Sequence, residues 1–196
     1  MKIIIIGENH GQNNKSSVLP FYIKPDSALI KGGKPFFIPD FTRKCMCSLH
    51  LVVRISRLGK SIPQQFANRY FDAVTLGVNF WADDVLQRVK AEMQPWTEAV
   101  SFDASAVIGE MINVDEVLEQ IMTPRMEIDK TDVGVSSLLE AKEKIMQEIA
   151  QLSSYFTLRE GDFLFTGPLT PPISVAEDNH LEAWLSETRL LKFNVK

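Results

Sequence analysis

The sequence predicts a β-rich protein of the mixed α+β class, built as a single domain over residues 1–196. Two observations lead to this prediction. Short runs of β-branched or alternating apolar residues recur along the whole chain, and only a few segments carry apolar residues at helical spacing. No repeat, low-complexity stretch or linker interrupts them. A chain of 196 residues can also bury a sizeable core without help from disulfides or a metal.

The first part of the chain consists mainly of predicted strands. Residues 3–6 form a continuous β-branched run typical of a buried strand, and a glycine-bounded loop follows at residues 7–11. Residues 21–25 and 27–30 resemble two further short strands. A turn is expected at Gly32 and Gly33, and another apolar segment follows at residues 36–39.

The middle of the chain contains the clearest strand pattern. Apolar residues alternate through residues 49–55, with Leu49, Leu51, Val53 and Ile55 sharing one face. A capping box at Ser61 predicts a helix over residues 61–71. A second strand is expected at residues 74–80, close to the first.

A short helix and a mixed segment follow. Asp83 and Asp84 offer a helix N-cap and negative charge in the first turn, and Pro95 cannot continue the helix. Residues 106–109 are expected to be a strand, while the conformation of residues 104–135 is otherwise left open.

The last third begins with a second capping box at Ser137, which predicts a helix ending near Ser153. Its apolar stripe faces the core, and its charged side is interpreted as a solvated face that comprises Glu140, Lys142, Glu143, Lys144 and Glu148. Gly161 is expected to allow a turn before a strand at residues 163–165, and two strands around Glu187 and Thr188 complete the chain.

Composition excludes several classes of function. The net charge is -4, and no basic stripe or RNA-binding aromatic motif is present, so we expect no nucleic-acid partner. The apolar run at the N-terminus ends at Ile6, too short for a signal peptide or a membrane span, so we expect no membrane partner. Cys45 and Cys47 are the only cysteines, and their spacing favours reduced thiols in a cytoplasmic protein.

A motif between Gly77 and Asp103 resembles the fumarylacetoacetate hydrolase family. The family pattern reads Gly-x-Asp-x-Thr-x-Arg-Asp-x-Gln, then Pro-Trp, then Ala-Lys-x-Phe-Asp. This chain keeps its frame at Gly77, Ala82, Asp84, Pro95, Trp96, Ala99, Phe102 and Asp103. It departs from the pattern where the family has functional side chains, at Asn79, Trp81, Asp83, Leu86 and Val100.

The resemblance extends from Ile3 to Val195 and implies a fold, an assembly and a cofactor. It implies a β-roll with short peripheral helices, commonly as a homodimer, and a site for magnesium or another divalent cation. The family's three anionic ligands correspond here to Ser48, His50 and Asn79. A hydroxyl, an imidazole and an amide would not outcompete water for magnesium. We therefore expect no cofactor.

A zinc site is an alternative, because Cys45, Cys47 and His50 form a Cys-x-Cys-x-x-His pattern. On one strand, however, the two cysteines share the face of Leu49, opposite His50. A fourth ligand is also missing nearby.

The family's acid–base loop is also altered. Its Gly and Asn are matched by Gly7 and Asn9, but its Tyr, His and Glu correspond to His10, Asn13 and Ser16. The remaining candidates for catalysis are His10, His50, Asp83 and Asp84. For His10, a solvent-facing loop histidine is the favoured alternative to a titrating catalytic group.

The resemblance places Asn9, Lys24, Trp81, Thr166 and Gly167 at the substrate pocket. Lys24 is a candidate contact for a small anionic ligand, or alternatively a solvated surface residue. Trp81 is expected to narrow the pocket, with its indole N–H bonded to His50 or Ser48. The alternative is an outward position in a dimer contact. We also expect Ser48, His50 and Asn79 to form hydrogen bonds among themselves or through water.

Two functional hypotheses follow. The first is a catalytically silent family member with a binding, regulatory or assembly role. The second is a hydrolase, isomerase or decarboxylase with a rebuilt site, acting on a 2-oxo or 1,3-dicarbonyl carboxylic acid. Losing one charge-stabilising group typically costs orders of magnitude in rate, and this chain has replaced several, which favours the first hypothesis.

Overall fold

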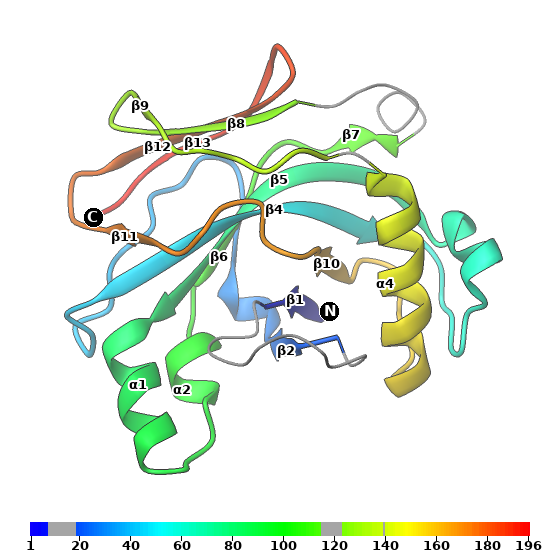
Figure 1. The fold of residues 1–196 in the computed structure, drawn as a ribbon, viewed down its shortest axis with the longest axis horizontal. Coiled ribbons are helices and arrows are strands. Elements are labelled where there is room, and N and C mark those ends of the chain that lie inside the picture. Colours follow the sequence, from blue (N-terminus) through cyan, green and yellow to red (C-terminus); the bar gives the residue numbers. More distant parts are fainter. Residues whose placement is uncertain (8–18, 115–122, 139) are drawn as a thin grey trace.

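The protein is a β-rich α+β structure in which two long strands carry a curled sheet (Figure 1). It is described from a computed structural model, which covers residues 1–7, 19–114, 123–138 and 140–196. In these ranges one sheet has the strand order β2-β1-β10-β4-β5-β6-β3, with β11 also paired to β4 and β7 to β5. A second sheet has the order β13-β12-β8-β9. The predicted fold class is confirmed.

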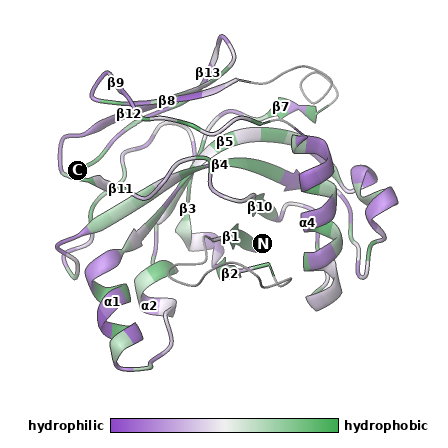
Figure 2. Cartoon of the chain, viewed as in Figure 1, coloured by the Kyte–Doolittle hydropathy of each residue, from purple (hydrophilic) through white to green (hydrophobic). Residues whose placement is uncertain are grey.

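The long strands β4 (Cys45–Ile55) and β5 (Phe71–Ala82) form the centre of the main sheet. They pair antiparallel, with Ser48 opposite Asn79 and His50 opposite Gly77. The expectation that these two segments lie together is confirmed. Both faces of these two strands are buried, in keeping with the hydrophobic residues that Figure 2 shows along them.

Glycine at position 77 is required by packing. A Cβ at Gly77 would lie 2.6 Å from Val52 Cγ2 and 2.9 Å from a ring carbon of Phe165. Strand β5 can therefore approach Val52 and Phe165 this closely only because residue 77 has no side chain.

The other strands of the main sheet are short. The N-terminal strand β1 (Ile3–Ile6) is fully buried between β2 (Phe21–Lys24) and β10 (Phe163–Phe165), as predicted. The remaining members are β3 (Leu29–Ile30), β6 (Ala106–Ile108), β7 (Ile112–Asn113) and β11 (Ile173–Val175).

The second sheet lies above the long strands in Figure 1. It consists of β8 (Pro124–Ile128), β9 (Thr131–Asp132), β12 (His180–Leu185) and β13 (Thr188–Asn194). The prediction of two strands around Glu187 and Thr188 is confirmed.

The helices lie at opposite sides of the molecule. Helices α1 (Asp83–Ala91) and α2 (Thr97–Val100) lie at one end of β5, and α4 (Ala141–Tyr155) lies at the opposite side of the molecule (Figure 1). Two 3₁₀ segments, η1 (Asp26–Ala28) and η2 (Gln64–Arg69), complete the described helical elements.

Several helix starts differ from the prediction. Residues 61–71 do not form an α-helix: Ser61 has a positive φ of 51°, and only the 3₁₀ segment η2 follows. The helix α4 begins at Ala141 and not inside the predicted capping box; its N-cap is the left-handed residue Glu140, which makes no side-chain cap bond. At α1 the N-cap is Ala82, so Asp83 and Asp84 are first-turn residues and not the cap.

One strand prediction is also corrected. Ser27 and Ala28 lie in η1, so only Leu29 and Ile30 of the predicted segment form a strand. The apolar segment at residues 36–39 contributes a single bridge between Phe36 and Val195. The turn at Gly32 and Gly33 is confirmed by positive φ angles of 73° and 69°.

The two cysteines lie on the core side of β4. Cys45 and Cys47 are free and buried in the same hydrophobic cluster as Leu49, and His50 faces the other side, where its ring contacts Phe165. This arrangement is the one that strand alternation predicted.

Candidate functional site

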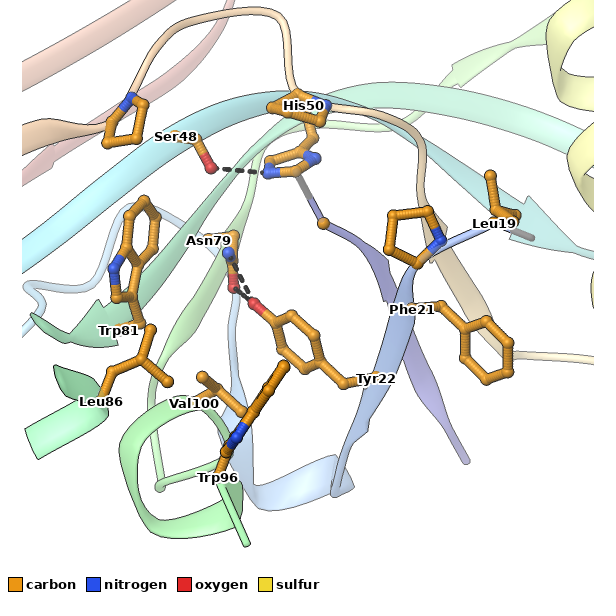
Figure 3. Close-up of a pocket in the computed structure, with 14 residues that line it drawn as sticks. Leu19, Phe21, Tyr22, Ser48, His50, Asn79, Trp81, Leu86, Trp96 and Val100 are labelled. Carbon is orange, nitrogen blue, oxygen red and sulfur yellow. Dashed lines mark hydrogen bonds between the residues drawn. The ribbon is translucent and has the colours of Figure 1, made fainter. Parts of the chain in front are cut away.

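A pocket of about 390 Å³ opens beside the centre of the main sheet. Its floor comes from the paired strands β4 and β5, which present Ser48, His50, Asn79 and Trp81 (Figure 3). Ser48 and His50 point the same way because they are two residues apart on β4, and Asn79 faces Ser48 across the ladder.

Apolar and aromatic groups form the walls. The strand β2 contributes Phe21 and Tyr22, α1 contributes Leu86, and α2 with the preceding residue contributes Val100 and Trp96. The described lining residues include no Lys, Arg, Asp or Glu. The pocket therefore suits a small ligand with an apolar or aromatic body and few polar atoms.

Ser48 and His50 form a hydrogen-bonded pair on the pocket floor. Ser48 Oγ lies 2.8 Å from His50 Nε2, and His50 Nδ1 lies 2.6 Å from the carbonyl oxygen of Thr166. Burial lowers the pKa of His50 to about 4, more than the Thr166 carbonyl raises it, so the imidazole is neutral at pH 7.

Asn79 bonds to Tyr22 instead of joining that pair. The Tyr22 hydroxyl lies 2.9 Å from Asn79 Nδ2 and 3.2 Å from Oδ1 (Figure 3). Burial raises the pKa of Tyr22, with a smaller opposing effect of the Asn79 contact. The expected hydrogen bonding of the polar trio is thus found between Ser48 and His50, while Asn79 takes a partner that the sequence reading did not name.

Trp81 lines the pocket and is 5% exposed, so it does not turn outward. Its hydrogen bond is to the Asp83 carboxylate. The expected acceptor was His50 or Ser48, whereas the partner found is an acidic residue two positions along the chain. That Trp81 narrows the pocket stays a prediction.

Asp83 and Asp84 do not line the pocket. Asp83 pairs with Lys44 at 2.8 Å, and Asp84 accepts bonds from Thr42 and the Arg43 amide. Burial alone would raise the pKa of each carboxyl, but hydrogen bonds lower the pKa of both overall, and the Lys44 charge lowers that of Asp83 further. Through these contacts, both carboxylates link the start of α1 to the segment that precedes β4.

Lys24 does not line the pocket either, and it is not a solvated residue. It is fully buried, with Nζ 2.8 Å from the carbonyl oxygens of Phe80 and Ser105 and from Ser105 Oγ. Burial lowers its pKa well below the ordinary value. The three oxygens match the three N–H groups of an ammonium, so Lys24 joins β2 to β5 and the segment before β6.

Thr166 and Gly167, which were expected at the pocket, are not among its lining residues; they contact His50 and Glu148. The Thr166 carbonyl holds His50, and the Gly167 amide donates to Glu148 Oε1 at 3.3 Å. Glu148 is 3% exposed, so its assignment to a solvated face was wrong. Burial raises its pKa to about 7, although the Lys144 charge and the Gly167 amide oppose the shift.

Two candidates from the N-terminal loop lie outside the described residues. These are His10, proposed as a titrating group, and Asn9, proposed for the pocket; Asn13 and Ser16 lie outside as well.

The described residues do not fit a divalent cation. Ser48, His50 and Asn79 are uncharged and bonded to protein partners, whereas magnesium prefers anionic oxygens in near-octahedral geometry. Across the described ranges, no group of three or more His, Cys, Asp and Glu side chains is placed to hold a metal.

The altered motif positions nevertheless converge. Six residues that stand where the resemblance implied functional side chains line this one pocket, namely Ser48, His50, Asn79, Trp81, Leu86 and Val100. The motif thus predicted where the site lies, but it did not predict which chemical groups the site contains. Tyr22 and Glu148 were missed. Glu148 had a detectable signal, because it is three residues after Ile145 and four before Leu152, on the apolar stripe of α4.

Comparison with protein families gives one match over almost the whole chain. The model described as "Fumarylacetoacetate (FAA) hydrolase C-terminal" matches residues 6–195. Among curated proteins, the chain is 27% identical to mitochondrial oxaloacetate tautomerase FAHD1 of Pongo abelii, over 99% of this chain and 91% of the relative. It is 25% identical to oxaloacetate tautomerase YcgM of Escherichia coli, over 85% of this chain and 80% of the relative.

Solved structures share the fold. Fumarylpyruvate hydrolase from Pseudomonas aeruginosa, in complex with Mn²⁺ and pyruvate, superposes with a TM-score of 0.89 at 21% identity, covering 100% of this chain and 89% of that one. A fumarylacetoacetate hydrolase family protein from Yersinia pestis gives a TM-score of 0.86 at 23% identity, covering 100% and 92%. Within the described residues, none of the helices combines the length and hydrophobicity needed to cross a membrane.

Proposed function

The chain belongs to the fumarylacetoacetate hydrolase family, and from this premise we propose that it is a metal-independent member that binds a small, largely apolar molecule. In this proposal the protein is silent in the metal-dependent chemistry of the family. The observation that carries the proposal is the hydrogen-bonded, uncharged set formed by Ser48, His50 and Asn79 on the pocket floor.

Charge supports this proposal. A divalent ion must give up part of its hydration shell to bind protein, and anionic ligands normally offset that loss. The described residues of the lining offer no anionic oxygen, and the neutral His50 imidazole has both nitrogens engaged. Relatives named oxaloacetate tautomerase belong to the same family, but we do not propose their activity for this chain, because its described site has this uncharged composition.

The lining also defines the ligand. Trp81 and Trp96 offer aromatic surfaces, and Leu86 and Val100 offer aliphatic ones. Lys24, the cation expected to hold an anionic ligand, is committed to backbone and hydroxyl oxygens outside the pocket. An uncharged ligand is therefore favoured over an anionic one.

We also propose that the protein acts as a homodimer in the cytoplasm, with a binding, regulatory or assembly role.

Tryptophan fluorescence tests the proposal. The Trp184→Phe variant leaves Trp81 and Trp96 as the reporters, because Trp184 lies in the second sheet against Arg125. A small aromatic probe such as an uncharged benzoate ester is expected to change the emission equally in EDTA and in Mn²⁺. Saturable binding that requires Mn²⁺, or no binding with either, would contradict the proposal.

A further inference from the structure

Ser48 and His50 lie at the pocket surface with the geometry of a nucleophile and its base. Both side chains line the pocket, and Ser48 Oγ lies 2.8 Å from His50 Nε2 (Figure 3). An activated serine is recognised by a base within hydrogen-bond reach that is itself oriented by a third group. Here the third group is the carbonyl of Thr166, 2.6 Å from Nδ1.

The hydrogen bonds determine which nitrogen carries the proton. A carbonyl oxygen can only accept, so His50 Nδ1 must be the N–H that donates to Thr166. A neutral imidazole has a single N–H, which leaves Nε2 as an acceptor. Ser48 must therefore donate its hydroxyl proton to Nε2, which is the direction that activates a serine for attack.

The peptide group that orients His50 is itself held from behind. The Thr166 carbonyl and the Gly167 amide belong to one peptide unit, and that amide donates to the buried Glu148 carboxyl at 3.3 Å. The second oxygen of Glu148 has no hydrogen-bond partner among the described residues. Hydrogen bonds thus connect Ser48 to His50, His50 to the Thr166–Gly167 peptide group, and that peptide group to Glu148. Glu148 is therefore a positioning residue, which fixes the plane of the Thr166 carbonyl.

A donor for developing negative charge is also nearby. Asn79 faces Ser48 across the β4–β5 ladder, and its amide has two N–H groups, of which the contact with Tyr22 uses one. An amide at this position resembles the side-chain donors that stabilise tetrahedral intermediates in acyl transfer.

We propose that Ser48 is the nucleophile and His50 the general base of a metal-independent hydrolase that acts on small, uncharged esters. This inference rests on the proposed function, because the apolar part of the ester occupies the same pocket. The peptide bond between Thr166 and Gly167 orients the base, and Asn79 supplies the oxyanion contact.

The reaction proceeds in two balanced halves. Ser48 Oγ bonds to the acyl carbon while its proton passes to His50 Nε2; the bond from that carbon to the leaving oxygen then breaks, and His50 returns the proton to the alcohol. Water next attacks the acyl-serine and gives its proton to Nε2. The carboxylic acid departs, and the proton returns to Ser48 Oγ.

The environment of His50 predicts an unusual pH profile. The groups that act on it are Ser48 on its own strand, the Thr166 carbonyl, and the charges of Lys24 on β2 and Lys144 on α4. Burial and the two lysine charges lower the pKa of His50, while the carbonyl raises it less than burial lowers it. Because the base stays unprotonated, esterase activity should remain nearly constant from about pH 8 down to about pH 5, where an ordinary histidine base would lose activity. A weak base also favours activated esters as substrates.

The experiment uses p-nitrophenyl acetate and p-nitrophenyl benzoate with the full-length protein. We expect a burst of p-nitrophenolate and, after acid quenching, an acyl group mapped to Ser48 by peptide mass spectrometry. Ser48→Ala should lose the burst and the label, and His50→Gln should slow acylation by at least about 100-fold. Ser154→Ala, at an exposed serine on α4, is the matched control and should retain both.

The outcomes separate this inference from the proposed function. If the ester changes the emission of the pocket tryptophans but never acylates Ser48, the nucleophile is refuted and the binding function stands. If acylation occurs elsewhere and persists in Ser48→Ala, the inference is likewise refuted. If the ester neither binds nor acylates, both fail. Melting temperatures of the variants show whether a loss comes from unfolding, and labelling of folded wild type by a fluorophosphonate gives an independent result.

Discussion

Replacing Glu148 with glutamine should change how the stability of the protein depends on pH. Glu148 is buried on α4, with one oxygen bonded to the Gly167 amide and the other without a partner among the described residues. Burial raises the pKa of its carboxyl from an ordinary 4.5 to about 7, with Lys144 as the charge that opposes the shift. Glutamine keeps the shape and an acceptor oxygen but cannot ionise.

The direction of the effect follows from proton binding. Between the two pKa values the folded protein holds the Glu148 proton and the unfolded chain does not, so stability falls as pH rises from 4.5 to about 7. At about 1.4 kcal/mol per pKa unit, the interval corresponds to roughly 3 kcal/mol. His50 acts in the opposite sense: its folded pKa of about 4 lies below the ordinary 6.5, so its contribution is lost as pH falls through that interval.

The two contributions should nearly cancel in the wild type. Glu148→Gln removes one of them, and its free energy of unfolding should therefore decrease by roughly 3 kcal/mol as pH is lowered from about 7 to about 4, relative to the wild type. Urea denaturation across this range measures the difference. Glu143→Gln, at an exposed position on the same helix, is the control and should follow the wild type. Parallel pH dependences for the wild type and Glu148→Gln would refute the reasoning.

Three further predictions concern the fold and assembly. Gly77→Ala should destabilise the protein by about 1–3 kcal/mol, because the new methyl group would overlap Val52 and Phe165; an unchanged urea midpoint would show that the strand can shift. Lys24→Met should cost at least about 2 kcal/mol by leaving buried oxygens without a donor, while Lys34→Met at an exposed lysine should be neutral, and equal stabilities would contradict this role of Lys24. The protein should be a dimer by light scattering, and a concentration-independent monomer would overturn that expectation.

The sequence predicted the central strands because their signal is local. The alternation of Leu49, Leu51, Val53 and Ile55 is visible without knowledge of any partner, and the structure buries all four in β4. The helix starts at Ser61 and Ser137 failed for the opposite reason. A capping box reflects only a local preference. Here the positive φ of Ser61 and of Glu140 takes the backbone out of the right-handed helical region at both positions.

The site was predicted in position but only partly in chemistry. Lys24 was predicted at the pocket, or alternatively on the surface, because its acceptors at Phe80 and Ser105 are more than fifty residues away in sequence. Glu148 was assigned to the charged face of α4, although its spacing from Ile145 placed it on the buried stripe. The bonds of Ser48 and His50 depend on the Thr166 loop, which no local pattern brings to β4.

The most direct test of the account is a calorimetric titration with Mn²⁺ in the presence of pyruvate. These are the species named in the complex of the fumarylpyruvate hydrolase that shares this fold. The wild type should show no saturable binding, and its melting temperature should not rise with added metal. The variant Ser48→Glu, His50→Glu, Asn79→Asp should gain Mn²⁺ affinity, and adding Trp81→Thr should increase it further if the indole restricts the site. Tight, stoichiometric Mn²⁺ binding by the wild type would contradict the central claim that this pocket is metal-independent.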